Sequence, residues 1–137
     1  MSLYLDASVL VRLLGSERPV LELVSNQPEP LLVSSFAAGE VAAAISRLAR
    51  TGDLSAAEAT ELLAAFDLWR EDAAEAIGTD ARDIVEGDRI VRDFSLKLKL
   101  PDAIHLASSL RRGATLVTAD QRLAAAARNR GASVLAL

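Results

Sequence analysis

Four acidic residues, spread along the whole chain, are of a type that could bind one divalent cation together. They are Asp6, Glu40, Asp102 and Asp120. Carboxylates that converge need protons or cations, because two like charges about 4 Å apart repel by about 4 kcal/mol at an effective dielectric near 20. With no Cys and a single His, the ligands would be oxygens, which favours Mg²⁺ or Mn²⁺ over zinc. Such an ion can activate water for attack on a phosphodiester.

Two of these acids directly follow predicted strands. Asp6 comes after the apolar stretch Leu3-Tyr4-Leu5, and Asp120 comes shortly after Thr115-Leu116-Val117. In parallel α/β sheets, ligand sites form beyond the carboxyl ends of the strands. We therefore expect both carboxylates at one edge of a sheet.

The other two acids belong to predicted helices. Glu40 lies early in an Ala-rich helix predicted for residues 36–51. The stretch 98–107 contains Pro101 followed by Asp102, and we expect Asp102 to cap a helix there, because the free amides and the helix dipole favour a carboxylate. Helix capping alone is the plainer interpretation of Asp102.

Short apolar segments alternate with helical patterns along the chain, which predicts an α/β fold with a mainly parallel sheet and helices on both faces. A capping-box pattern, Ser55 to Glu58, opens one helix, and Thr79 is expected to cap another that includes Ile84, Ile90 and Phe94. The predicted strands are residues 3–5, 31–33, 74–77, 115–117 and 133–135. The predicted helices are residues 9–14, 19–25, 36–51, 55–69, 79–94, 103–110 and 120–129.

Length and composition predict one domain over residues 1–137, since the 51% hydrophobic content is enough for a packed core. Without Cys there is no sign of an oxidising compartment. No apolar run is long enough for a membrane span or arranged as a signal peptide, so we expect a cytoplasmic protein with no membrane contact.

Charge is distributed unevenly. Residues 1–96 contain 8 Lys and Arg against 17 Asp and Glu, whereas residues 97–137 contain 7 against 2. The net charge of −4 argues against binding nucleic acid through the overall field. The basic C-terminal third, which includes Asp102, is compatible with an anionic partner, and equally with charges that only solvate helices.

Four motifs, taken in order and spacing, resemble those of PIN-domain ribonucleases of the kind found as VapC toxins of VapBC toxin–antitoxin pairs. The resemblance covers essentially the whole chain and rests on Tyr4-Leu5-Asp6-Ala7-Ser8, on Ser35 with Glu40, on the stretch from Leu100 to Ala107, and on the stretch from Thr118 to Leu123. It implies a PIN-like three-layer sandwich and a Mg²⁺- or Mn²⁺-dependent endoribonuclease, in which the four acids bind the ion.

The resemblance also implies partners. Family members act on RNA, typically form homodimers, and are inhibited by an antitoxin that can place a basic side chain in the acidic site. The helices with Phe36, Leu62, Phe66 and Trp69 carry more apolar positions than a small core needs, which would suit a partner surface.

Several further polar residues have two interpretations each. Two hydroxyls could orient ligands or cap helices. Three arginines could contact RNA phosphates or solvate helix ends, and the one histidine is expected to be packed in the core. These residues are Ser8, Thr118, Arg111, Arg112, Arg122 and His105.

The main alternative is a non-catalytic α/β binding module with an acidic pocket, and four matched acids argue against it. A phosphoryl-transfer domain built on Asp6 is disfavoured, because Asp6-Ala7-Ser8 contains no second Asp and no Lys follows Asp102.

Overall fold

A parallel β-sheet of five strands forms the centre of the molecule. The computed structural model describes residues 1–137, and its strand order is β3-β2-β1-β4-β5, with every neighbouring pair parallel. The strands are β1 (Leu3–Leu5), β2 (Leu31–Ser34), β3 (Glu75–Ile77), β4 (Thr115–Thr118) and β5 (Val134–Ala136).

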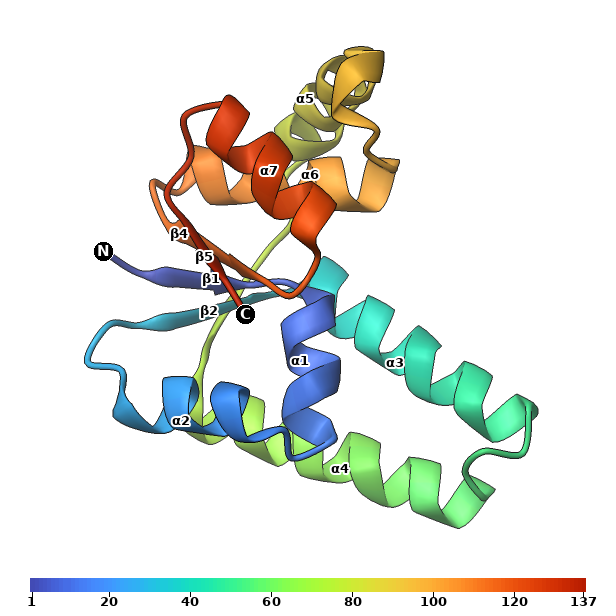
Figure 1. Cartoon of the computed structure of the whole chain (residues 1–137). Coiled ribbons are helices and arrows are strands. Elements are labelled where there is room, and N and C mark those ends of the chain that lie inside the picture. Colours follow the sequence, from blue (N-terminus) through green and yellow to red (C-terminus); the bar gives the residue numbers. More distant parts are fainter.

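Helices cover both faces of this sheet, which gives the predicted α/β sandwich. In Figure 1, α1 to α4 lie on one face and α5 to α7 on the other. The helices are α1 (Ala7–Leu14), α2 (Arg18–Asn26), α3 (Ser35–Arg50), α4 (Ala56–Ala73), α5 (Ala81–Val91), α6 (Leu100–Arg111) and α7 (Gln121–Asn129), with a 3₁₀ turn, η1 (Phe94–Leu96).

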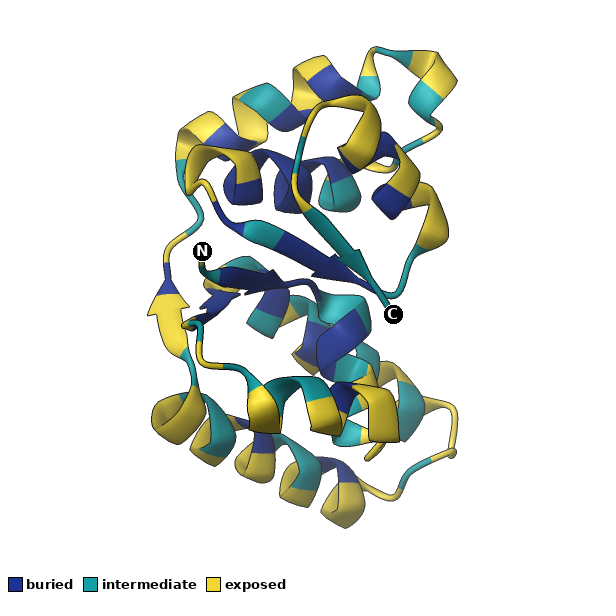
Figure 2. Ribbon diagram, turned by 60° about the vertical axis from the view of Figure 1, so that its left-hand side comes forward, coloured by how far each residue is buried: buried dark blue, intermediate teal, exposed yellow.

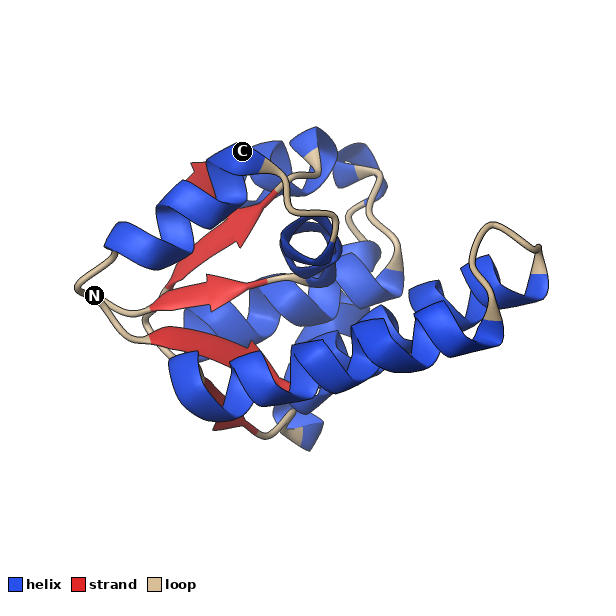
Figure 3. Cartoon of the chain, turned by 90° about the horizontal axis from the view of Figure 1, so that it is seen from below, coloured by secondary structure: helices blue, strands red, loops and turns tan.

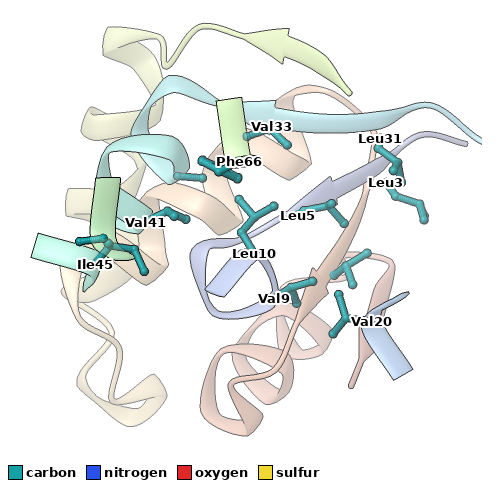
Figure 4. Packing of buried hydrophobic residues seen from close by; sticks show 13 residues of the cluster. Leu3, Leu5, Val9, Leu10, Val20, Leu31, Val33, Val41, Ile45 and Phe66 are labelled. Atoms are coloured by element: carbon teal, nitrogen blue, oxygen red, sulfur yellow. The ribbon is translucent and has the colours of Figure 1, made fainter. Parts of the chain in front are cut away.

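The two faces of the sheet bury separate cores, because successive strand residues point to opposite sides. Leu3 and Leu5 pack with the residues of α1 to α4, as shown in Figure 4. Tyr4, between them in β1, packs instead against α5 to α7 with Leu106 and Leu116. Burial on both faces explains why the central strands are continuous apolar runs.

The order of the strands reverses between β1 and β4. From β1 the chain moves outward through β2 to β3, and it then returns to place β4 on the other side of β1. In open parallel sheets, the crevice at such a reversal is where ligands bind, at the carboxyl ends of the strands. Asp6 directly follows β1, and Asp120 follows β4 by two residues, so the fold places both at this point.

Three local predictions are wrong. Asp102 does not cap α6: Lys99 is the N-cap residue, Pro101 lies in the first turn, and Asp102 follows it inside the helix. Asp80, rather than Thr79, caps α5, since its carboxylate accepts from the Arg82 amide. Phe94 lies beyond that helix, in η1.

The other predicted elements are confirmed within a few residues at their ends. The capping box is present as predicted: Ser55 accepts from the Glu58 amide at 3.0 Å, and Glu58 accepts from the Ser55 amide at 3.1 Å. The two helices that follow β2 form a long hairpin, α3–α4, which extends past the carboxyl ends of the strands (Figure 3).

The apolar helix residues singled out in the sequence differ in their burial. Phe66 is buried, whereas Phe36, Leu62 and Trp69 are only partly buried, so a partner surface on these helices stays a prediction. Leu68 of α4, Ile84 of α5 and Phe94 of η1 are exposed, at 67%, 49% and 86%. Figure 2 also shows β3 as the exposed edge of the sheet.

The helices are too short or too polar to span a lipid bilayer.

We expect Phe66→Ala to lower the free energy of unfolding by about 3–5 kcal/mol, because it leaves a cavity between α4 and the sheet. Leu68→Ala, two residues along the same helix, should change it by no more than about 0.5 kcal/mol. Urea denaturation followed by circular dichroism measures both. Equal losses in the two variants would contradict the core described above.

Candidate active site

Asp6 is a buried carboxylate held by three donors. It is 2% exposed and caps α1. Its Oδ1 accepts from the Ser8 hydroxyl at 2.5 Å and from the Val9 amide at 3.1 Å, and its Oδ2 accepts from the Thr118 hydroxyl at 2.5 Å. The Thr118 bond joins the end of β4 to the end of β1 across the reversal of strand order.

The same hydroxyls also bind the loop before α7. The Thr118 hydroxyl accepts from the Asp120 amide at 3.0 Å, and the Ser8 hydroxyl accepts from the Ala119 amide at 3.0 Å. Asp120 caps α7 as predicted, since its Oδ1 accepts from two amides of the first turn. Ser8 and Thr118 therefore hold the acidic residues in place, which the sequence left undecided.

Glu40 reaches the site from α3 and contacts the one histidine of the chain. Its Oε1 is hydrogen-bonded to Nε2 of His105, which lies on α6. The other ring nitrogen, Nδ1, is 2.8 Å from the Tyr4 hydroxyl. His105 is 2% exposed, so the prediction that it is packed is confirmed, and its contact with Glu40 was not anticipated.

Asp102 lies half-buried within the electrostatic reach of the other three acids. Burial raises the pKa of its carboxyl above the ordinary value, and the negative charges of Asp120, Asp6 and Glu40 raise it further. These interactions place all four predicted residues in one region of negative charge. The site set itself, as catalytic or metal-binding residues, stays a prediction.

Basic side chains border this acidic region. A groove of about 370 Å³ is lined by two acids and three cations: Asp102, Asp120, Lys97, Lys99 and Arg122, together with Gln121. A second groove of about 580 Å³ shares Lys97, Gln121 and Arg122 with the first and continues between η1 and α7 as far as Asn129. Lys97 has a left-handed backbone (φ 56°), a strained conformation for a residue other than glycine.

The structure distinguishes the arginines to which the sequence gave two interpretations. Arg122 lines the acidic groove. Arg111 is committed elsewhere, because its guanidinium makes two hydrogen bonds with the buried Asp83, at 2.7 and 2.9 Å. Lys97 and Lys99 were not singled out from the sequence. Their position just before Asp102, in the basic third of the chain, is the signal that could have identified them.

The carboxylate oxygens of the four acids are chemically suited to bind a hard cation. Asp102 has no hydrogen-bonding partner that lowers its pKa, and Oδ2 of Asp120 and Oε2 of Glu40 accept no hydrogen bond from the protein. These are oxygen ligands of the kind that Mg²⁺ and Mn²⁺ prefer. As the side chains stand, however, no three acidic or histidine residues are grouped closely enough to bind one ion together.

Comparison with known families gives a match over nearly the whole chain. The sequence model of the PIN domain matches residues 3–129. The chain belongs to the PIN-domain family. No curated protein sequence matches it significantly.

Solved structures with the same fold share little sequence with this PIN domain. VapBC from Salmonella typhimurium bound to DNA has a TM-score of 0.75 at 15% identity, covering 99% of this chain and 98% of that one. VapBC2 from Rickettsia felis, bound to a DNA fragment from its promoter, has 0.74 at 14%, covering 100% and 99%. VapC20 from Mycobacterium tuberculosis, a Sarcin-Ricin loop cleaving toxin, has 0.70 at 17%, covering 91% and 95%.

We expect Asp102→Asn to raise the melting temperature of the protein by a few degrees near neutral pH in the presence of EDTA. The folded state raises the pKa of Asp102, so the ionised carboxylate opposes folding above that pKa, and the gain should disappear as the pH falls below it. Thermal unfolding at several pH values measures the effect.

Asp83→Asn provides the opposite case. Burial opposes ionisation of Asp83, but hydrogen bonds from Arg111 and the Asp80 amide outweigh it and hold its pKa below the ordinary value. The free energy of unfolding of this variant should be lower by about 1–3 kcal/mol near neutral pH, and the difference should shrink in acid. A fall in melting temperature for both variants would contradict the penalty that burial and charge repulsion impose on the ionised Asp102.

Proposed function

We propose that this PIN domain is a Mg²⁺- or Mn²⁺-dependent endoribonuclease, and that it is the toxin of a VapBC-type pair. The observation that carries the proposal is that Asp6, Glu40, Asp102 and Asp120, from four separate elements, lie in one region of negative charge at the strand-order reversal of a PIN fold. Burial is the main cause of the raised pKa of Asp102, and the negative charges of the other three acids add to it. A divalent cation would relieve the repulsion.

Each acid has a separate structural role in this proposal. Asp6 is held rigidly by Ser8 and Thr118, whereas the free oxygens of Glu40 and Asp120 are open to a ligand. When bound, the ion supplies activation of water and neutralises charge on a phosphate oxygen during in-line displacement. The carboxylates need no nucleophilic role, because they bind the ion and can accept the proton of the attacking water.

The substrate would lie in the joined grooves. Lys97, Lys99 and Arg122 line the groove beside Asp102 and Asp120 and can bind the phosphates on either side of the scissile bond. The extension between η1 and α7 offers room for further nucleotides of a single strand. This arrangement explains how a chain with net charge −4 could bind RNA, since the cations are concentrated where the substrate must lie.

The partner in this proposal is an antitoxin protein. Several solved structures with this fold are toxin–antitoxin complexes, including VapBC-1 from Haemophilus influenzae and a complex from Klebsiella pneumoniae. A basic antitoxin side chain would be attracted to Asp102 and Asp120 in the groove. A homodimer remains a prediction from the family resemblance.

Asp6→Asn and Asp102→Asn should each lower metal-dependent RNA cleavage by about 100-fold or more, because each removes a carboxylate that binds the ion. Cleavage is mapped on total RNA with Mg²⁺, with Mn²⁺ and with EDTA. Asp67→Asn, an exposed acid of α4, is the matched control and should cleave normally. If the wild type left RNA intact in every divalent metal, the binding-module alternative would be favoured.

Arg122→Gln should weaken RNA binding about equally for all sequences and reduce the dependence of binding on salt by about one charge. Arg112→Gln is the control, because Arg112 is exposed at the far end of α6 and lines neither groove. Both arginine changes are made in the Asp102→Asn background, which should cleave RNA very slowly. Binding of fluorescent RNA is then measured over a range of salt concentrations. Identical salt slopes for both arginine variants would exclude the groove as the RNA site.

A further inference from the structure

A chain of buried hydrogen bonds runs from the start of α3, through the centre of the sheet, to the Glu40 carboxylate. The Ala37 amide donates to the Ser34 hydroxyl at 3.0 Å, and this hydroxyl is 3.0 Å from the hydroxyl of Tyr4. The Tyr4 hydroxyl is 2.8 Å from Nδ1 of His105, whose Nε2 is bonded to Glu40. This series of hydrogen bonds therefore begins and ends on α3.

The proton positions along this series of hydrogen bonds follow from its first donor, the Ala37 amide. Because the Ser34 oxygen accepts from an amide, its own hydrogen is free to be donated, and the Tyr4 oxygen is the acceptor beside it. The Tyr4 hydrogen is then directed to Nδ1 of His105. The opposite direction would leave the buried Ser34 hydroxyl without an acceptor, at a cost of about 1–3 kcal/mol.

The imidazole ring is consequently fixed in one tautomer. With Nδ1 accepting, the ring proton is on Nε2 and is donated to Oε1 of Glu40. Two aromatic rings also hold the imidazole in place: Tyr4 in an edge contact at 5.7 Å between centroids, and Phe36 in a tilted contact at 5.3 Å. Burial raises the pKa of Tyr4 to about 12, so its hydroxyl keeps its hydrogen over the working pH range.

We propose that Tyr4 and His105 are positioning residues that hold Glu40 in the orientation needed at the acidic site. This rests on the proposed function in taking Glu40 as part of that site. Glu40 is 32% exposed and comes from a helix that leads away from the sheet, so its side chain would otherwise sample several rotamers. Fixing Oε1 by the His105 donor leaves Oε2 directed for a ligand.

The tautomer can be read directly, because His105 is the one histidine of the chain. Nitrogen-15 spectra of histidine-labelled, metal-free protein should show a protonated Nε2 and an unprotonated Nδ1. Tyr4→Phe removes the donor to Nδ1 and should change the Nδ1 chemical shift, while the proton stays on Nε2, because the Glu40 carboxylate can only accept. A wild-type ring protonated on Nδ1, or on both nitrogens, would overturn the proposal.

The effect on Glu40 is measured with Mn²⁺ as the probe. His105→Leu should weaken Mn²⁺ binding by about 10–100-fold, whereas His105→Gln, whose amide can still donate to Glu40, should recover most of it. In a Glu40→Gln background, His105→Leu should have no further effect, which a merely structural role would not predict.

Ser109→Ala is the matched control, since Ser109 is equally buried on α6 but bonds only to the Leu106 carbonyl. Mn²⁺ affinity in His105→Leu equal to that of the wild type would overturn the proposal. A wild type that binds Mn²⁺ but leaves RNA intact would instead refute the nuclease function, while these two measurements still decide the role of His105.

Discussion

The buried carboxylate of Asp6 imposes the constraint on which the rest of the site depends. A carboxylate that is 2% exposed must be paired with donors, and the three that serve it come from α1 and from the end of β4. Satisfying Asp6 therefore joins the two strands at which the sheet order reverses. The same hydroxyls bind the Ala119 and Asp120 amides, so the start of α7 is set by the same requirement.

Charge at this edge of the sheet is arranged in two zones. The acids lie where β1, α3, α6 and α7 begin or end. Burial raises the pKa of Asp102, and repulsion by the other acids raises it further. The cations Lys97, Lys99 and Arg122 stand at the rim of the same groove. An ion in the acidic zone and a phosphate chain along the rim would each reduce the repulsion, which is the electrostatic basis of the proposed function.

The sequence predicted most elements well, because their signals are local. Short apolar runs at the strands, the Ser55–Glu58 capping box and the strand-then-acid pattern at Asp6 and Asp120 each depend on a few neighbouring residues. The errors arose where more than one neighbouring residue could be the N-cap of a helix. Thr79 and Asp80 can each cap a helix, and the capping box that Asp80 forms with Asp83 favours Asp80. Before α6, helical geometry starts ahead of Pro101, so Asp102 lies within the first turn.

By itself, the sequence determined the fold class, the four acids and the PIN-family resemblance, since residue type, order and spacing are properties of the chain. Only the tertiary structure decided what each side chain contacts. Tyr4 and His105 are 101 residues apart, and Arg111 is separated from Asp83 by 28, so no local pattern could show that one pair supports Glu40 and the other merely fixes α5 to α6. Buried hydrogen-bonding groups must find partners wherever the packing brings them together, and packing is set by the whole chain.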